Sequence, residues 1–231
     1  MPKLFATVLG AGLALATVCA AAQLLAPAPV RPDAMMSALT AEVMSVLNKD
    51  AGAARTSEFE QLVERRIVPV FDFQRMTRLA LGRNWRLASA EQQEELTMQF
   101  KTLLVRTYSP ALLEFRNQAI DYKPLRTTVG ETEVTVRSAM RRPGVEPLPI
   151  DYDMAQGPAG WQVYDVKIAG VSLVLAYRES LATTVRASGI DGLIRTLKDK
   201  NQQNEGAANA PVAPKLAPVL MIYSTALTLK P

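Results

Sequence analysis

The chain has 231 residues, 48% of them hydrophobic and 21% charged, which is typical of a globular protein with a substantial core. The formal net charge is only +4. The basic residues are scattered rather than clustered, so we expect no nucleic-acid partner. The sequence has no histidine, and its one cysteine, Cys19, lies in an N-terminal segment that we expect to be removed. A mature chain without histidine or cysteine excludes most zinc, copper and haem sites, histidine bases and cysteine nucleophiles. A mechanism that uses only carboxylates stays open.

The first 22 residues have the pattern of a secretion signal. Lys3 precedes an apolar run from Leu4 to Ala22 that is rich in Ala and Gly and ends in three alanines. A basic start, a short apolar run and a small-residue cleavage site are typical of a signal peptide. The run is short and weakly hydrophobic for a membrane anchor. We therefore expect residues 1–22 to be removed on export and residues 23–32 to form a linker.

Apolar residues at steps of three and four predict helices over residues 33–49, 57–67, 72–81 and 89–108. Ser57 and Ser89 begin capping boxes, and Asp72 can cap the third helix. Gly82 follows that helix at a favoured position for glycine. Pro110 is expected to restart a short helix that runs through Phe115.

After Asn117 the apolar period changes from 3.6 to 2 and predicts strands near residues 119–128, 131–140, 147–155 and 160–168. Turn residues separate these strands, which indicates an antiparallel meander with one apolar face. A helix from Ser172 to Gly189 and another near residues 191–200 follow. Residues 202–231 have a low-complexity composition and are expected to be disordered.

This order of elements predicts an α+β fold, with helices packed on a curved antiparallel sheet of four to five strands. Asp151 and Asp153 alternate with the apolar residues of the third strand, so a solvated strand face is expected for both. Asp165 lies between valines, and we expect it to be partly buried, with Arg78 or Arg178 as a possible ion-pair partner.

Four sets of short segments stand out along the chain: residues 70–73 (VFDF) with 81–85 (LGRNW), 89–93 (SAEQQ) with Phe100 and 106–108 (RTY), 160–166 (GWQVYDV), and 170–174 (GVSLV) with 177–178 (YR). In this order and spacing they resemble the MlaC family, whose members bind phospholipids and are also described as toluene-tolerance proteins. The resemblance spans roughly residues 35–201, so residues 33–201 are identified as an MlaC-like lipid-binding domain.

The resemblance implies a periplasmic carrier that shuttles phospholipid between membranes. The implied partners are an outer-membrane lipoprotein–porin complex and an inner-membrane ABC transporter with an MCE-domain subunit. It also implies a monomer with an apolar cavity between sheet and helices, a headgroup near solvent, and neither catalytic residues nor a cofactor.

A carrier of this kind must shelter hydrocarbon from water. Two lipid tails expose roughly thirty methylenes, which costs on the order of 20 kcal/mol at about 0.8 kcal/mol each. We expect lining residues on the apolar face of the sheet and on the helices, although periodicity does not separate such a lining from packed core. The candidates are Val134, Val136, Met140, Ile150, Tyr152 and Met154 from the sheet, and Leu79, Phe100, Leu104, Tyr108, Val174 and Tyr177 from the helices.

Arg178 is a candidate for the headgroup because a guanidinium can bind phosphate through two hydrogen bonds. A structural arginine is the alternative for this position.

Two other functions stay open for the chain. One is an α+β enzyme acting on an apolar substrate, with Asp121, Asp165 or a tyrosine as its acid or base. The other is a periplasmic chaperone whose apolar face binds lipoproteins.

Overall fold

The computed structural model describes residues 30–49, 57–109, 112, 117–126, 130–142 and 144–204. The predicted signal peptide, residues 23–29 of the predicted linker and the predicted tail beyond residue 204 lie outside the described residues. So does the predicted short helix at 110–115, except for Leu112. Residues 202–204, predicted to be disordered, instead form the end of the last helix.

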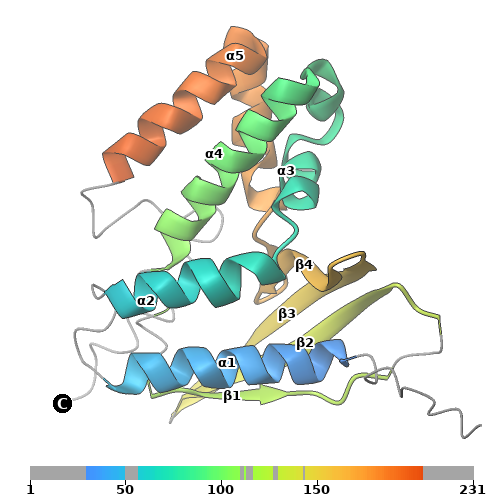
Figure 1. The fold of residues 1–231 in the computed structure, drawn as a ribbon, viewed down its shortest axis with the longest axis vertical. Coiled ribbons are helices and arrows are strands. Elements are labelled where there is room, and N and C mark those ends of the chain that lie inside the picture. The colour runs from blue at the N-terminus through green and yellow to red at the C-terminus, as the bar shows by residue number, and fades with distance from the viewer. Residues whose placement is uncertain are drawn as a thin grey trace, which may run out of the picture.

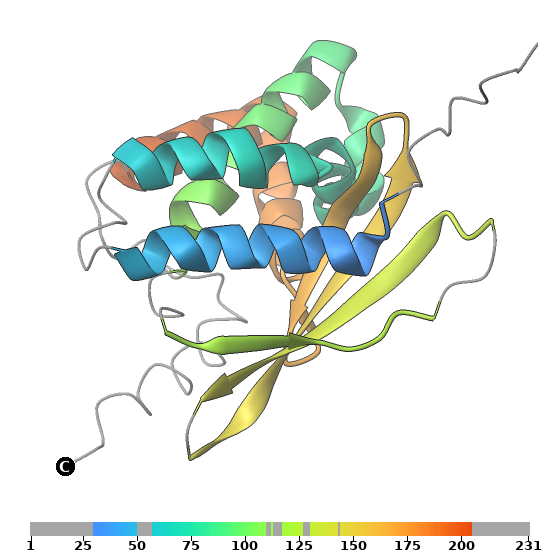
Figure 2. The same cartoon turned by 60° about the horizontal axis from the view of Figure 1, so that its bottom comes forward.

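The first layer of helices is formed by α1 (Pro32–Lys49) and α2 (Ser57–Leu62). A π-helical turn, η2 (Val63–Ile67), and a 3-10 turn, η3 (Val68–Val70), continue α2. The two helices lie side by side in both views (Figures 1 and 2). They share an apolar cluster of buried residues: Val43, Leu47, Phe59, Leu62 and Val63.

The second layer contains α3 (Phe73–Leu81), the 3-10 segment η4 (Gly82–Leu87) and α4 (Ala90–Tyr108). The predicted caps at Asp72 and Ser89 are confirmed. Asp72 Oδ1 accepts a hydrogen bond from the Arg75 amide at 2.9 Å, and Ser89 forms a complete capping box with Gln92. Gly82 has a φ of 56°, a value that favours glycine, directly after α3.

The last helix, α5 (Arg178–Asn204), packs along α4 (Figure 1). At Gly189 the backbone leaves the helical conformation, with φ 68° and ψ −172°. The predicted break at this glycine is therefore confirmed. The predicted cap at Ser172 is confirmed, because its Oγ accepts a hydrogen bond from the Leu175 amide at 3.0 Å. The α-helix itself begins later than predicted, because a 3-10 turn, η6 (Leu175–Tyr177), precedes α5.

The sheet has five antiparallel strands in the order β1-β2-β3-β4-β5, which confirms the α+β meander. The strands are β1 (Ala119–Tyr122), β2 (Glu133–Arg142), β3 (Val145–Gly157), β4 (Gly160–Ile168) and β5 (Val171–Ser172). The first is shorter than predicted, because Pro124 has no amide hydrogen to continue the ladder.

One face of the sheet is apolar and turns toward the helices (Figure 2). Val136, Tyr152 and Val166 are neighbours across the three central strands on this face. On the opposite face Thr135, Asp153 and Asp165 are neighbours in the same way. The predicted alternation of the two faces is confirmed.

The prediction that Asp153 lies on a solvated face is wrong, because only 9% of this residue's surface is exposed. Its carboxylate contacts the Lys167 ammonium at 2.6 Å and accepts a hydrogen bond from Thr135 Oγ1 at 2.8 Å. The paired cation offsets the cost of burying the charge.

Asp165 is 6% exposed and accepts a hydrogen bond from the Val174 amide at 3.2 Å. It makes no ion pair with Arg78 or Arg178 within the described part of the chain. The proposed ion pair is therefore wrong. Burial raises the pKa of the Asp165 carboxyl above its usual value, because desolvation disfavours the charged form.

The buried apolar residues form three separate clusters rather than the single core that most domains have. The largest joins α3, α4 and α5 to one end of the sheet. The second lies between α1 and α2. The third joins Met36 of α1 to Val136, Met154 and Val163 of the sheet.

The raised pKa of Asp165 predicts a pH-dependent stability. Between the ordinary carboxyl pKa and the raised folded pKa, the folded state holds a proton that the unfolded state has lost. The free energy of unfolding therefore falls as the pH rises through that window and then stays level. Asp165→Asn keeps an acceptor for the Val174 amide but cannot ionise, so it should gain stability relative to the parent over the same pH window.

Urea unfolding of both proteins at a series of pH values from acidic to neutral measures this difference. A difference in unfolding free energy that stays constant with pH would contradict the assignment.

Candidate functional site

An apolar cavity of about 220 Å³ lies where the three clusters meet. It is bordered by α1, by the segment from α2 to the start of α3, by the C-terminal end of α4 and by the apolar face of the sheet. The helical lining is Met36, Leu39, Thr40, Val43, Met44, Val63, Ile67, Val68, Phe71, Phe73, Met76, Leu104, Val105, Tyr108, Ser109 and Leu112. The sheet and the turn after it contribute Ile120, Ile150, Tyr152, Val166, Ile168 and Leu173.

No charged side chain lines this cavity within the part of the chain that the structure describes. The polar side chains in the lining are Thr40, Tyr108, Ser109 and Tyr152. A charged ligand group that entered this cavity would lose its hydration, and the lining offers few hydrogen bonds and no opposite charge to replace it. The cavity is therefore suited to hydrocarbon.

Hydroxyl groups connect α1 to the sheet beside the cavity. The Tyr122 hydroxyl donates to the Met36 carbonyl oxygen at 3.2 Å, so the Thr40 hydroxyl, 2.6 Å away, donates to Tyr122. The Tyr122 and Tyr152 rings stack with their centroids 6.5 Å apart. These bonds fix the position of α1 over β1 and satisfy polar groups that would otherwise be costly to bury.

Burial raises the pKa of the Tyr152 phenol far above its usual value, because the phenolate would lose its hydration. Burial likewise raises the pKa values of Tyr122 and Tyr177. These phenols stay protonated at neutral pH. Together with the absence of ionisable acids and bases in the described lining, this keeps the cavity electrically neutral.

Of the twelve lining residues predicted from the sequence, the structure places four in the cavity wall: Leu104, Tyr108, Ile150 and Tyr152. Three others belong to the cluster below α1, where Val136 and Met154 are fully buried and Val134 packs against them.

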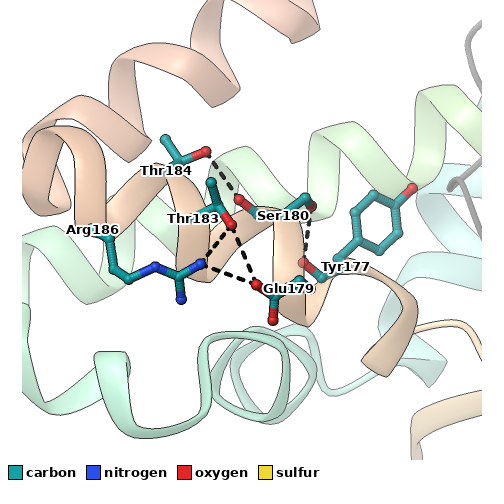
Figure 3. Close-up of polar contacts among 6 residues, drawn as sticks. All are labelled: Tyr177, Glu179, Ser180, Thr183, Thr184 and Arg186. Carbon is teal, nitrogen blue, oxygen red and sulfur yellow. Dashed lines mark hydrogen bonds and ion pairs between the residues drawn. The ribbon is translucent and has the colours of Figure 1, made fainter.

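The remaining five belong to the largest cluster or pack against it: Leu79, Phe100, Met140, Val174 and Tyr177. Phe100 meets the Tyr177 ring edge to face, with centroids 5.4 Å apart. Figure 3 shows the Tyr177 ring directed away from the polar side chains of the first turns of α5. In the structure these eight residues hold the domain together around the cavity.

Arg178, the candidate headgroup residue, lies against the junction of α3 and η4. Its Nη2 donates to the Leu79 carbonyl oxygen at 2.7 Å. It does not line the cavity. The geometry is that of a structural arginine that caps the end of α3, the alternative that the sequence left open.

The sequence analysis missed the largest single contribution to the lining, which comes from α1. Met36, Leu39 and Val43 form an apolar stripe at helical spacing, and Thr40 and Met44 widen it. The stripe identifies a buried face but not the surface that it faces. One feature of the sequence could have indicated the lining. The α1 residues on this face include no aromatic side chain that would fill the space between α1 and the sheet.

The carboxylates named for an enzyme lie outside the cavity. Asp121 is exposed on β1 and forms an ion pair with Arg141. Asp165 lies on the opposite face of the sheet.

The described residues contain no group of acidic side chains placed to hold a metal ion. None of the described helices is long and apolar enough to cross a bilayer.

Comparison with known proteins is consistent with this geometry. The chain is 25% identical over 180 residues to the toluene tolerance protein ttg2D of Pseudomonas putida, covering 77% of this chain and 83% of the relative. It is 25% identical over 162 residues to the intermembrane phospholipid transport system binding protein MlaC of Haemophilus influenzae, covering 69% and 73%.

Among solved structures, a phospholipid-binding protein of Ralstonia solanacearum, determined in complex with a phospholipid, superposes with a TM-score of 0.68. It is 36% identical in sequence, and the match covers 76% of this chain and 99% of the other. The family model described as "MlaC protein" matches residues 37–199. The chain belongs to the MlaC family.

Proposed function

We propose that this protein is a periplasmic phospholipid carrier that shelters lipid tails in the apolar cavity while it moves between the outer and inner membranes. The observation that carries the proposal is a neutral, apolar cavity held open between three packed clusters. The names of the relatives support it, since one binds a phospholipid in its structure and another belongs to a phospholipid transport system.

The cavity volume sets what the protein can hold in the described conformation. An apolar protein cavity of about 150 Å³ holds one benzene molecule. By proportion, 220 Å³ accommodates roughly nine carbon atoms. That is less than one full tail and about a third of the methylenes in a two-tailed lipid. We therefore propose that a loaded carrier is wider than the described conformation.

The division of the core shows where it can widen. The α1–α2 pair has its own apolar cluster, so it can move away from the sheet without breaking the largest cluster. The contacts that hold α1 to the sheet and its flanks are the Thr40–Tyr122–Met36 hydrogen bonds, the small third cluster and two hydrogen bonds near the helix ends. In these two, the Asn117 amide donates to Asn48 Oδ1 and Arg31 donates to the Leu125 carbonyl oxygen. We infer that displacement of α1 and α2 admits the tails.

We further propose that an outer-membrane lipoprotein–porin complex and an inner-membrane ABC transporter with an MCE-domain subunit exchange lipid with this protein. A soluble carrier needs such partners, because a lipid that leaves a membrane unassisted loses on the order of 20 kcal/mol of hydrophobic stabilisation.

The first prediction concerns the ligand itself. Organic extracts of the purified protein should contain phospholipid, identified by mass spectrometry, and the protein should transfer labelled phospholipid between vesicles. An extract without phospholipid, combined with no transfer, would contradict a carrier function. Recovery of a bound lipoprotein or peptide without free lipid would favour a chaperone instead.

The second prediction tests the cavity. Val105→Trp places a large ring in the lining, so it should reduce the amount of bound phospholipid by more than about tenfold, since each excluded methylene forfeits about 0.8 kcal/mol. Leu79→Trp is the matched control, because Leu79 was a sequence candidate but lies outside the lining. It should leave binding within about threefold of the parent.

Thermal unfolding of both variants checks that each one folds. Equal loss of phospholipid in the two variants, at similar melting temperatures, would show that the cavity is not the binding site.

The third prediction concerns export. When the full chain is expressed in a Gram-negative host, the protein released from the periplasm should lack residues 1–22 and begin at or near Gln23. Intact-mass measurement of the osmotic-shock fraction reads the cleavage site. Uncleaved protein retained in the cytoplasm would contradict the periplasmic assignment.

A further inference from the structure

A second, polar pocket of about 310 Å³ lies on the other side of α3 from the cavity. It is lined by Asp72, Gln74, Arg75, Arg78, Trp85 and Gln93. Phe73 and Met76 of the same helix line the apolar cavity. Helix α3 therefore separates the two spaces. The polar pocket is not part of the apolar cavity that we propose shelters the lipid tails.

Trp85 is the least expected member of this pocket. Its residue is only 9% exposed, yet its indole N–H donates to no acceptor within the described residues. The Nε1 atom itself is accessible to solvent, unlike the fully buried polar atoms that lack a partner elsewhere in the described residues. An accessible, unused donor on the pocket wall is available to an acceptor group of a ligand.

Arg78 adds an unused cation. Its side chain is exposed on α3 and forms no ion pair or hydrogen bond with the described residues. Arg75, by contrast, is held in place by Glu133 at 2.8 Å and lies 3.6 Å above the centre of the Tyr164 ring. Gln93 is also fixed, because its amide donates to the Trp85 and Ala88 carbonyl oxygens.

The surrounding charge favours an anion. Residues 73–90 contain four arginines and no acidic residue. Asp72 is the one carboxylate in the lining, and it already accepts the Arg75 amide hydrogen at 2.9 Å. Nearby arginines of α5 are occupied elsewhere: Arg178 by the Leu79 carbonyl oxygen, and Arg186 by Glu179 and Thr183 (Figure 3).

From these observations we propose that the pocket beside α3 binds a phosphate group, with Arg78 and the Trp85 indole N–H as its principal donors. A phosphate presents several strong acceptor oxygens in three dimensions, which suits a lining that contains both a guanidinium and an indole N–H. The phosphate is borne either by a free anion or by a lipid headgroup, and the experiment below separates the two.

The test uses the two tryptophans of the chain. Trp161→Phe leaves Trp85 as the sole tryptophan, so its fluorescence reports on the pocket. Titration with inorganic phosphate, at an ionic strength held constant with sodium chloride, should give a saturable change in emission. In the same background Arg78→Gln should weaken this binding by about tenfold or more, because it removes a charge-assisted hydrogen bond.

Arg83→Gln is the matched control, since it removes one exposed positive charge of η4 outside the pocket lining. It should weaken phosphate binding by less than about threefold, through the general field alone. Circular dichroism checks the fold of both variants. A response to phosphate no larger than that to chloride, or equal affinities in the Arg78 and Arg83 variants, would overturn the proposal.

A second arm identifies the source of the phosphate. Vesicles that contain phosphatidic acid, compared with phosphate-matched soluble glycerol 3-phosphate, are titrated against the same variants. An Arg78-dependent change with vesicles that exceeds the soluble ester supports a lipid headgroup, and the reverse order supports a free anion. A vesicle response that is the same in the Arg78→Gln variant reflects lipid in the apolar cavity and counts against a headgroup in this pocket.

Discussion

The structure depends on an apolar space that must not collapse. Hydrophobic burial normally draws helices onto a sheet until no void remains. Here the buried residues pack into three clusters that each bury their own surface, and the cavity lies between them. Hydrogen bonds from Thr40 to Tyr122 and from Tyr122 to the Met36 carbonyl oxygen hold α1 at its distance from the sheet. The vacancy is thus a consequence of how the core is divided.

Charge is distributed so that this space stays neutral. The ionisable groups of the sheet lie on its opposite face, where Asp153 contacts Lys167, and the phenols beside the cavity have pKa values raised by burial. Helix α3 continues this separation on the other side, since it presents Met76 to the cavity and Arg78 to the polar pocket. One nine-residue helix therefore divides an apolar from a polar environment.

Local signals in the sequence predicted most of the fold, because each one depends on neighbouring residues. Asp72 and Ser89 cap the helices that their positions predict, and Gly189 interrupts α5 as expected. The short strand β5 escaped prediction because two residues are too few to show a period. The buried state of Asp153 also escaped, because the cation that stabilises it comes from the next strand.

The sequence by itself determined which face of each element is apolar, and with it the α+β arrangement and the family. Only the tertiary structure decided which apolar residues face empty space and which face each other. Phe100 and Val136 have the same periodic signature as Leu104 and Ile150, yet the first two lie in packed clusters and the last two in the cavity wall. Periodicity records burial along one chain segment, whereas a cavity is defined by the distance between segments.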